Sequence, residues 1–384
     1  MLYRLFPKCK TNISRVSFGA MRWPSEEICH QIMNYGLDLG LNYADCSTGY
    51  VNGKSQIWVA HAIAKRRKEI LISSKTTFAQ APTADQVRAK IEKSLQDTGL
   101  DYFDFYQLWG LSEPAVLQAA LARGGFVEGV RKAQQDGLVR LGLGFTFHGS
   151  EELFRAAIDS GEFLAATVSY NLMNRKEEGN IAYAAQHGVG IVIMNPLAGG
   201  ILGLAGDPSL DFLCGREGGP CHGALRFLHA NPAITTSIVG FRAVSEVDPA
   251  VASLNGADRL TEEWRQDQMR QMDAVKLIEG QFCTGCGYCK DCPAKFNPSA
   301  YMQHMRDFAR YGVAPERLTE WIHSRYAHQD IAAEIGKCTE CGRCEKECPQ
   351  HLPIVEQIRR GKQALGVSTT SEYRISNQER RMSK

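Results

Sequence analysis

Two short cysteine runs near the C-terminus contain the residues whose type and spacing point most directly to chemistry. In each run three cysteines follow one another at two-residue gaps, and a proline comes directly after the fourth. Three thiolates at this spacing can wrap one face of an iron–sulfur cubane, and in two-cluster ferredoxins the fourth cysteine ligates the other cluster. The runs therefore predict two [4Fe–4S] clusters with crossed ligands. One set is Cys283, Cys286, Cys289 and Cys348, and the other is Cys338, Cys341, Cys344 and Cys292.

Zinc is the competing interpretation of the same cysteines. A zinc ribbon needs two Cys-x-x-Cys knuckles for each ion, whereas four cysteines in one tight loop would crowd a tetrahedral metal. The repetition of the pattern, each time with its trailing proline, favours iron and sulfide. The first run has two residues before its last cysteine and the second has three, which leaves the partner of Cys292 open. Such clusters serve either to carry electrons or to hold the fold together.

The composition narrows the class of protein. The chain has 384 residues, a net charge of +2, 44% hydrophobic and 22% charged residues. These values are ordinary for a globular protein of about two domains, and the small net charge argues against a nucleic-acid partner. No apolar run reaches the roughly 18 residues of a membrane span, and the N-terminus lacks a secretory signal. We therefore expect a cytoplasmic protein with no membrane partner.

Short apolar runs alternate with helix-like stretches over the first 255 residues. Eight such alternations predict a (β/α)8 TIM barrel. A doubly wound open sheet is the alternative, but no Gly-x-Gly-x-x-Gly sequence follows the first strand. The expected strands are Arg15–Gly19, Leu41–Asp45, Ile70–Ser74, Phe103–Trp109, Leu138–Thr146, Ala165–Tyr170, Gly190–Asn195 and Thr236–Gly240.

The barrel is expected to be followed by a small ferredoxin-like iron–sulfur domain. We place the barrel at residues 1–260, the iron–sulfur domain with a helical insert at 261–365, and a polar, solvated tail at 366–384. A glycine-rich stretch, 202–223, follows the seventh strand on the face where barrel enzymes carry their functional loops. It is either a lid or a tolerated surface insertion.

Several segments of the barrel, in order, resemble the aldo-keto reductase family. They are Val16–Pro24, Asn42–Tyr50, Ile72–Lys75, Asp104–Leu108, Gly137–Gly142 and Asn195–Gly200. Together with the cysteine runs, the chain resembles the branch of that family that carries a C-terminal ferredoxin-like extension. The resemblance implies an oxidoreductase that acts on a small molecule.

Three residues at the C-terminal ends of the second and third strands carry the expected acid chemistry. A tyrosine is a weak acid with an ordinary pKa near 10. A nearby lysine ammonium would stabilise its phenolate, and an aspartate would keep that lysine charged and in place. Tyr50, Lys75 and Asp45 are the candidates, with Tyr50 as proton donor to a carbonyl oxygen. The alternative is a buried Lys75–Asp45 ion pair with Tyr50 as a core aromatic residue.

The chain departs from the family pattern at the second donor to the substrate oxygen. Family carbonyl reductases have a histidine after the fourth strand, where this chain has Trp109. An indole offers one N–H donor but cannot handle protons as an imidazole does. His148, just past the fifth strand, is expected on the same face and could partly substitute for it.

The resemblance also implies NADPH or NADH as cofactor, although the expected contacts are eroded. Thr146 and Thr167 stand where the family has a serine and a glutamine for the nicotinamide amide. Glu246 falls where the family contacts the 2′-phosphate, with Arg242 four residues earlier, and a carboxylate there would repel a phosphate. The expected cofactor contacts are Gly19, Met21, Thr146, Thr167, Pro196, Leu197, Gly240 and Arg242.

Three functions follow from these residues. The first is reduction of a carbonyl or conjugated double bond by NAD(P)H, with the clusters relaying electrons. The second is a one-electron reductase or eliminase that uses no nicotinamide and receives electrons from a ferredoxin or flavodoxin. The third is a redox sensor or electron carrier without enzymatic activity. A nicotinamide moves a hydride and a cubane single electrons, so direct exchange between them needs a flavin or a substrate radical.

Overall fold

The computed structural model describes residues 1–203, 210–214, 219–274, 283–310, 315–325 and 331–367. Parts of the expected lid at 202–223 and nearly all of the expected tail at 366–384 therefore lie outside the described residues. The chain divides into two compact units, which are described separately: a barrel unit, Met1–Met272, and a cysteine-rich unit, Asp273–Lys384.

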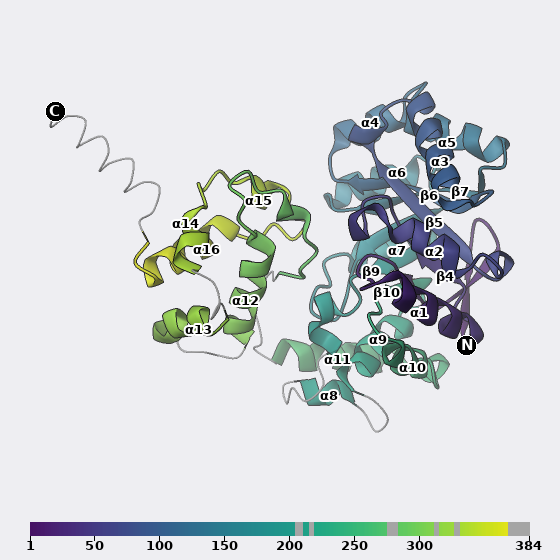
Figure 1. The fold of residues 1–384 in the computed structure, drawn as a ribbon. Coiled ribbons are helices and arrows are strands. Elements are labelled where there is room, and N and C mark those ends of the chain that lie inside the picture. Colours follow the sequence, from purple (N-terminus) through teal and green to yellow (C-terminus); the bar gives the residue numbers. More distant parts are fainter. Residues whose placement is uncertain (204–209, 215–218, 275–282, 311–314, 326–330, 368–384) are drawn as a thin grey trace, which may run out of the picture. The chain divides into compact units, whose positions relative to one another are not determined.

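The barrel unit is built on a closed barrel of eight parallel strands, in the order β10-β3-β4-β5-β6-β7-β8-β9 (Figure 1). Closure excludes the open doubly wound sheet. The strands run close to the positions expected from the sequence. They are β3 (Val16–Gly19), β4 (Tyr43–Asp45), β5 (Leu71–Thr77), β6 (Phe103–Leu111), β7 (Val139–Phe147), β8 (Ala165–Ser169), β9 (Gly190–Met194) and β10 (Thr236–Val239).

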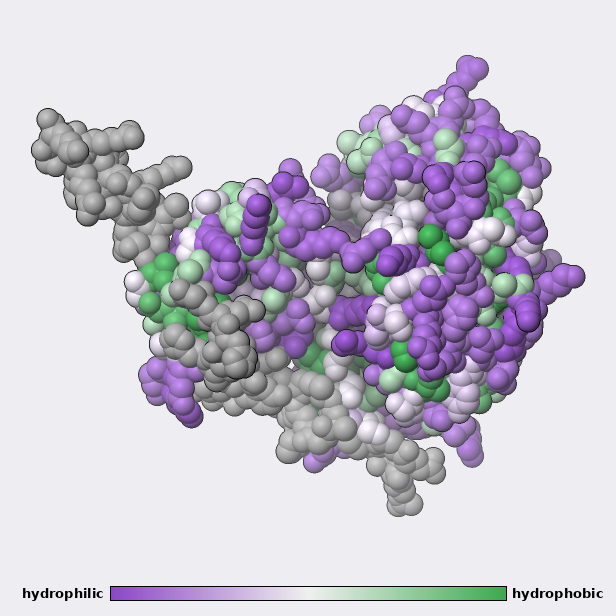
Figure 2. All heavy atoms as spheres, in the orientation of Figure 1, coloured by the Kyte–Doolittle hydropathy of each residue, from purple (hydrophilic) through white to green (hydrophobic). Residues whose placement is uncertain are grey.

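Helices between the strands surround the barrel. Their sequences contain their own start and stop signals: in α3, Thr83 and Gln86 form a capping box and Gly99 ends the helix at a φ of 69°. Figure 2 shows mainly hydrophilic residues on the visible outer face of this unit. The helices are α1 (Glu26–Asp38), α2 (Ser55–Ala62), α3 (Ala84–Thr98), α4 (Pro114–Leu121), α5 (Phe126–Gln135), α6 (Glu151–Asp159), α7 (Glu178–Gln186), α8 (Asp211–Cys214), α9 (Pro220–Ala230) and α10 (Val247–Ala252).

An N-terminal hairpin, β1 (Tyr3–Phe6) and β2 (Thr11–Ser14), was not expected from the sequence. Its Phe6 is fully buried against Phe105, with ring centroids 5.2 Å apart. Phe6 belongs to an apolar cluster with the first residues of several barrel strands, including Tyr43 and Leu71. The hairpin therefore plugs the N-terminal end of the barrel.

A further helix, α11 (Glu262–Ala274), belongs mainly to the barrel unit. Arg265 is buried and donates to Glu178 of α7 at 3.0 Å and to the Tyr170 hydroxyl at 3.3 Å. These bonds tie α11 to the barrel, and the division between the two units falls after residue 272 rather than after the expected residue 260. No helix among the described residues is long and apolar enough to cross a membrane.

The cysteine-rich unit consists of short helices packed around a small apolar core. Tyr301 is fully buried there, and its hydroxyl donates to the Gln357 carbonyl at 3.0 Å, which joins α12 to α16. The helices are α12 (Pro298–Arg310), α13 (Leu318–Arg325), α14 (Ile331–Gly336), α15 (Arg343–Lys346) and α16 (Ile354–Ala364). The fold class is thus a TIM barrel with a small cysteine-rich domain, as the sequence predicted.

Candidate functional site

A buried ion pair lies at the C-terminal end of the barrel strands. Asp45 is the last residue of β4, and Lys75 in β5 donates to its Oδ1. The side chains are 2% and 1% exposed. Gln107 of β6 donates to the other carboxylate oxygen at 2.8 Å and to Ser73 Oγ at 2.7 Å. A charged pair at this depth is favourable only when its remaining polar atoms are bonded, and Gln107 meets that need for Asp45.

Tyr50 follows β4 and is half-buried beside this pair. The Lys75 Nζ lies 4.7 Å from the centroid of the Tyr50 ring. Directly after Tyr50 come two residues in the left-handed region, Val51 at a φ of 51° and Asn52 at 52°. This conformation is costly for a β-branched residue, and such strain often accompanies functional sites. The turn holds the Tyr50 ring over the ammonium of Lys75.

Trp109 of β6 contacts the same tyrosine. The two ring centroids are 5.5 Å apart at 78°, an edge-to-face arrangement. A Cβ on Gly49 would lie only 2.7 Å from the Trp109 ring, so the glycine makes room for the indole. The structure thus brings together Asp45, Tyr50, Lys75 and Trp109.

His148 is half-buried and lies just past the end of β7. Its backbone N–H donates to the Leu111 carbonyl at 3.0 Å, which places it beside the end of β6. It therefore lies at the same end of the barrel as Trp109, on the neighbouring strand.

The two threonines expected at the nicotinamide are buried and already hydrogen-bonded within the protein. Thr167 donates to Gln107 Oε1 at 2.7 Å, and Thr146 Oγ1 accepts from the Gly110 N–H at 2.7 Å. A hydroxyl has one donor and two acceptor positions. Thr146 therefore keeps its donor for a ligand, whereas Thr167 has already used its own.

The remaining expected contacts lie in the loops after β3, β9 and β10. A Cβ on Gly19 would come within 3.3 Å of the Val239 backbone, so Gly19 allows β3 and β10 to approach closely. After β9, Asn195 has a φ of 58° and its side chain accepts from the Gly199 N–H at 2.6 Å. That bond shapes the turn that carries Pro196 and Leu197, while Met21 is the second residue after β3 and Gly240 the first after β10.

Glu246 folds back onto the loop after β10. Its Oε2 accepts from the Arg242 N–H at 2.6 Å. A backbone N–H at a loop is the kind of donor that binds a phosphate, and here a carboxylate occupies it. The loop therefore presents negative charge where the sequence placed the 2′-phosphate.

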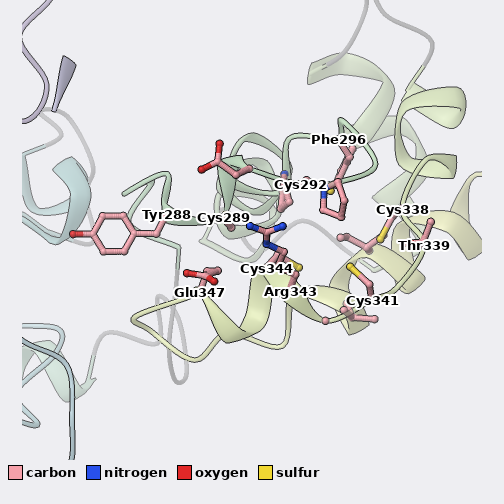
Figure 3. A pocket seen from close by; sticks show the side chains of 16 residues that line it. Tyr288, Cys289, Cys292, Phe296, Cys338, Thr339, Cys341, Arg343, Cys344 and Glu347 are labelled. Atoms are coloured by element: carbon pink, nitrogen blue, oxygen red, sulfur yellow. The ribbon is translucent and has the colours of Figure 1, made fainter. Parts of the chain in front are cut away.

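The cysteine-rich unit gathers the eight cysteines of the runs around two hollows. Figure 3 shows the first, which contains Cys338, Cys341 and Cys344 of the second run together with Cys292 of the first. Cys289 also touches this hollow. The second hollow is lined by Cys283, Cys286, Cys289 and Cys348. Each hollow thus has three cysteines of one run and the fourth of the other, with Cys289 bordering both.

The donors around these hollows fit a cluster better than a single ion. Within the described ranges, no three His, Cys, Asp or Glu side chains converge closely enough to hold one metal ion. The cysteines instead surround a space, and thiolates are the ligands of iron–sulfur clusters. Burial raises the pKa of Cys289 to about 12 and that of Cys344 to about 11, so these thiols must lose a proton when a metal binds.

Both parts of the chain match known families. Residues 15–276 match the model of the aldo/keto reductase family, and residues 279–352 match a 4Fe-4S dicluster domain. The chain is 22% identical over 205 residues to an uncharacterized oxidoreductase, YqkF, of Bacillus subtilis, covering 50% of this chain and 63% of that protein. It is 35% identical over 108 residues to an aldo/keto reductase of Synechocystis sp., covering 27% of this chain and 32% of that protein. The chain therefore spans less than two thirds of the length of these curated relatives.

Two solved structures share the fold of the barrel unit. An aldo-keto reductase of Bacillus halodurans in its holo form superposes with a TM-score of 0.61 at 22% identity, covering 71% of this chain and 96% of that one. An aldo/keto reductase of Klebsiella pneumoniae in complex with NADP and acetate gives 0.59 at 19% identity, covering 70% and 94%.

Proposed function

The chain belongs to the aldo/keto reductase family and is an oxidoreductase, and from this premise we propose that its barrel reduces a carbonyl or conjugated double bond of a small molecule with NAD(P)H. The observation that carries the proposal is the buried Asp45–Lys75 pair beneath Tyr50. Buried ion pairs contribute little net stability by themselves, so we assign this pair, which lies beside Tyr50, a role in the reaction.

Each residue of this set has a separate role in the proposed reaction. A bound nicotinamide supplies the hydride that reaches the substrate carbon. Tyr50 gives its hydroxyl proton to the substrate oxygen, and the Lys75 ammonium stabilises the phenolate that remains. Asp45 holds the Lys75 ammonium in place, and Gln107 fixes the carboxylate through its 2.8 Å bond. Solvent then returns a proton to Tyr50.

The nicotinamide contacts support the proposal only in part. Thr146 retains a hydroxyl donor for the carboxamide, and a structural neighbour of the barrel was solved with NADP. The carboxylate of Glu246 opposes a 2′-phosphate because like charges repel at close range. We therefore expect NADH to bind at least as well as NADPH.

We further propose that the cysteine-rich unit holds two [4Fe–4S] clusters. Cys283, Cys286, Cys289 and Cys348 would hold one, and Cys338, Cys341, Cys344 and Cys292 the other. The two hollows, each with cysteines of both runs, support this pairing. Such clusters supply single-electron transfer, and a small ferredoxin or flavodoxin is the partner class that suits them.

A second candidate function dispenses with nicotinamide. Clusters fed by an external donor would reduce a substrate beside Tyr50 one electron at a time. The observation in its favour is Trp109, whose indole contacts Tyr50 where carbonyl reductases of the family carry a histidine. Thr167 also favours this function, because its hydroxyl already donates to Gln107 and has no second proton to donate to a nicotinamide.

One anaerobic experiment separates the two functions. The full chain is reconstituted with iron and sulfide, and NADH and NADPH are tested by equilibrium binding and by bleaching of cluster absorbance. Binding of either nucleotide below millimolar concentration supports reduction by NAD(P)H. If neither nucleotide binds, the function without nicotinamide is favoured.

Tyr50→Phe tests the proton donor in both cases. It should abolish turnover while nucleotide binding and iron content stay unchanged. Tyr183→Phe is the matched control, because that hydroxyl bonds Asp159 at the surface. Wild-type turnover in Tyr50→Phe would refute the role of Tyr50.

A further inference from the structure

The two halves of the cysteine-rich unit repeat one structural pattern. Each cysteine run is followed by a helix that starts six residues after its last cysteine, α12 at Pro298 and α16 at Ile354. Corresponding backbone positions in the two halves also adopt left-handed φ angles. These are Gly285 and Glu340 (67° and 57°), Gly287 and Gly342 (77° and 73°), and Lys295 and His351 (55° and 50°). The repeat makes it possible to compare the surroundings of the two hollows residue by residue.

At the same place in each repeat a cation reaches back to its own cysteine run. Arg306 of α12 donates to the carbonyl of Cys283 at 3.0 Å, and Lys362 of α16 donates to the carbonyl of Cys338 at 2.8 Å. Both cysteines are the first of their run. Lys362 is only 1% exposed, so its ammonium acts in a poorly solvated setting where charge interactions are strong.

The repeat is broken at one position next to these cations. Glu340 carries a carboxylate, and the corresponding residue of the first run is Gly285. Glu340 bonds to Lys362 at 3.4 Å and to Arg359 of α16 at 2.9 Å. In the first run, a Cβ on Gly285 would meet the Gln303 side chain at 2.7 Å, so a neutral amide fills that space. The second run therefore has an acidic side chain beside its first two cysteines, and the first run has none at that position.

We propose that Lys362 and Glu340 form a charge pair that sets the reduction potential of the centre held by Cys338, Cys341 and Cys344. The proposal rests on the proposed function, namely that these cysteines hold an iron–sulfur cluster. Reduction adds one electron, and so one negative charge, to such a centre, and nearby charge is one of the factors that sets its potential. The Glu340 carboxylate lowers the potential, and the Lys362 ammonium raises it while holding the loop in place. Lys362 is thus a positioning residue, and Glu340 makes the two centres inequivalent.

The test measures potentials in the full-length reconstituted protein. Midpoint potentials are followed by EPR in anaerobic redox titrations of the wild type, Glu340→Gln, Lys362→Met and Lys362→Arg. Glu340→Gln keeps the size and one acceptor of the side chain and removes its charge. Glu320→Gln is the matched control, since it also removes one carboxylate from the unit but from an exposed pair with Arg317 on the surface of α13. Cys341→Ser, which alters a ligand of the second run, identifies the signal of that centre.

In Glu340→Gln the one-electron reduction of the second-run centre should become at least tenfold more favourable, which corresponds to a rise of about 59 mV. The potential of the first-run centre should not change. Lys362→Met should lower the potential of the second-run centre, whereas Lys362→Arg, which keeps the positive charge, should leave it at the wild-type value. Iron and sulfide contents report separately on the proposed function: a wild type without iron and sulfide overturns the function itself. A fully loaded Glu340→Gln whose potentials match those of Glu320→Gln overturns the charge pair, whatever the fate of Lys362→Met.

Discussion

Replacing Asp45 with asparagine removes the charge of the buried pair and one of its two acceptor oxygens while keeping the size of the side chain. Asp45 and Lys75 are 2% and 1% exposed, so water cannot replace the lost partner of the ammonium. The new amide oxygen can still accept the bond from Gln107, which now reaches Asp45 Oδ2 at 2.8 Å. The effect of Asp45→Asn therefore reports on the lost charge and the lost acceptor for Lys75 rather than on packing.

Two magnitudes follow for Asp45→Asn. Removing one partner of a buried ion pair costs about 3–5 kcal/mol of the free energy of unfolding, because an uncompensated charge remains. Without the carboxylate, nothing holds the Lys75 ammonium in its place 4.7 Å from the centroid of the Tyr50 ring, so the phenolate loses its stabilising charge. General acid catalysis contributes roughly 10²–10⁴-fold, so we expect kcat to fall by about that factor in the folded fraction.

Asp104→Asn is the matched control for this experiment. Asp104 is also fully buried and pairs with Arg67 at 2.9 Å and Arg140 at 2.5 Å, but it lies near the start of β6, away from Tyr50. Urea unfolding should show a loss of stability in both variants, whereas steady-state turnover of folded protein should fall only in Asp45→Asn. Equal turnover losses in the two variants, or wild-type turnover in Asp45→Asn, would refute the reasoning.

Three further substitutions test other parts of the chain. Cys348→Ala should lower iron and sulfide by about half and remove the centre of the first run, because crossed ligation assigns Cys348 there; loss of the second-run centre instead would contradict the crossing. Glu246→Gln should tighten NADPH binding about tenfold with little effect on NADH, since it removes the charge that opposes a 2′-phosphate, and equal changes for both nucleotides would exclude this role. Burial, with Arg4 nearby, holds the pKa of His229 well below 6.5. Below about pH 6.5 the unfolded chain therefore binds a proton that the folded chain does not. The free energy of unfolding then falls by about 1.4 kcal/mol for each pH unit. Urea titrations at pH 7 and pH 5 should show this loss in the wild type and a smaller one in His229→Gln; equal losses would disprove it.

The barrel could be predicted from the sequence because its signals are local. Apolar strand runs, helix caps and their regular alternation are visible without tertiary contacts, and the eight predicted strands coincide with β3 to β10. The N-terminal hairpin gave no such signal. Its strands have four residues each, and Phe6 acquires its role only when the ends of distant strands, such as those carrying Tyr43 and Leu71, close around it.

The candidate site was predictable to the extent that strand order fixes position. Asp45 and Lys75 end up together because consecutive parallel strands are neighbours and their C-terminal ends share one face. Gln107 was missed, although a polar residue within the apolar stretch Phe103–Leu108 was a signal for it. The contact between Trp109 and Tyr50 could not be predicted, since it depends on the path of the turn after β4 and on the space left by Gly49.

The unequal spacing of the two cysteine runs has a physical explanation in the backbone. In each run a glycine in the left-handed region, Gly287 or Gly342, precedes a single helical turn. In the first run this turn is a 3₁₀ helix, Tyr288–Lys290, and in the second it is the α-helix Arg343–Lys346. A 3₁₀ helix brings residues three apart onto one side, and an α-helix brings residues four apart together.

The helix type therefore absorbs the one-residue difference between the runs. In each run one residue, Asp291 or Glu347, separates the helical turn from the last cysteine, so the extra residue of the second run lies within its turn. The shorter spacing of the first run is therefore compatible with a similar arrangement of the cysteines in the two runs. The crossed pairing, in which Cys292 binds the centre of the second run and Cys348 that of the first, stays a prediction. It is compatible with a similar backbone course in the two runs. Deleting Glu347 would make the spacings equal, and it should disturb the centre of the first run, because Cys348 would then follow the longer helical turn without the residue that separates it from that turn.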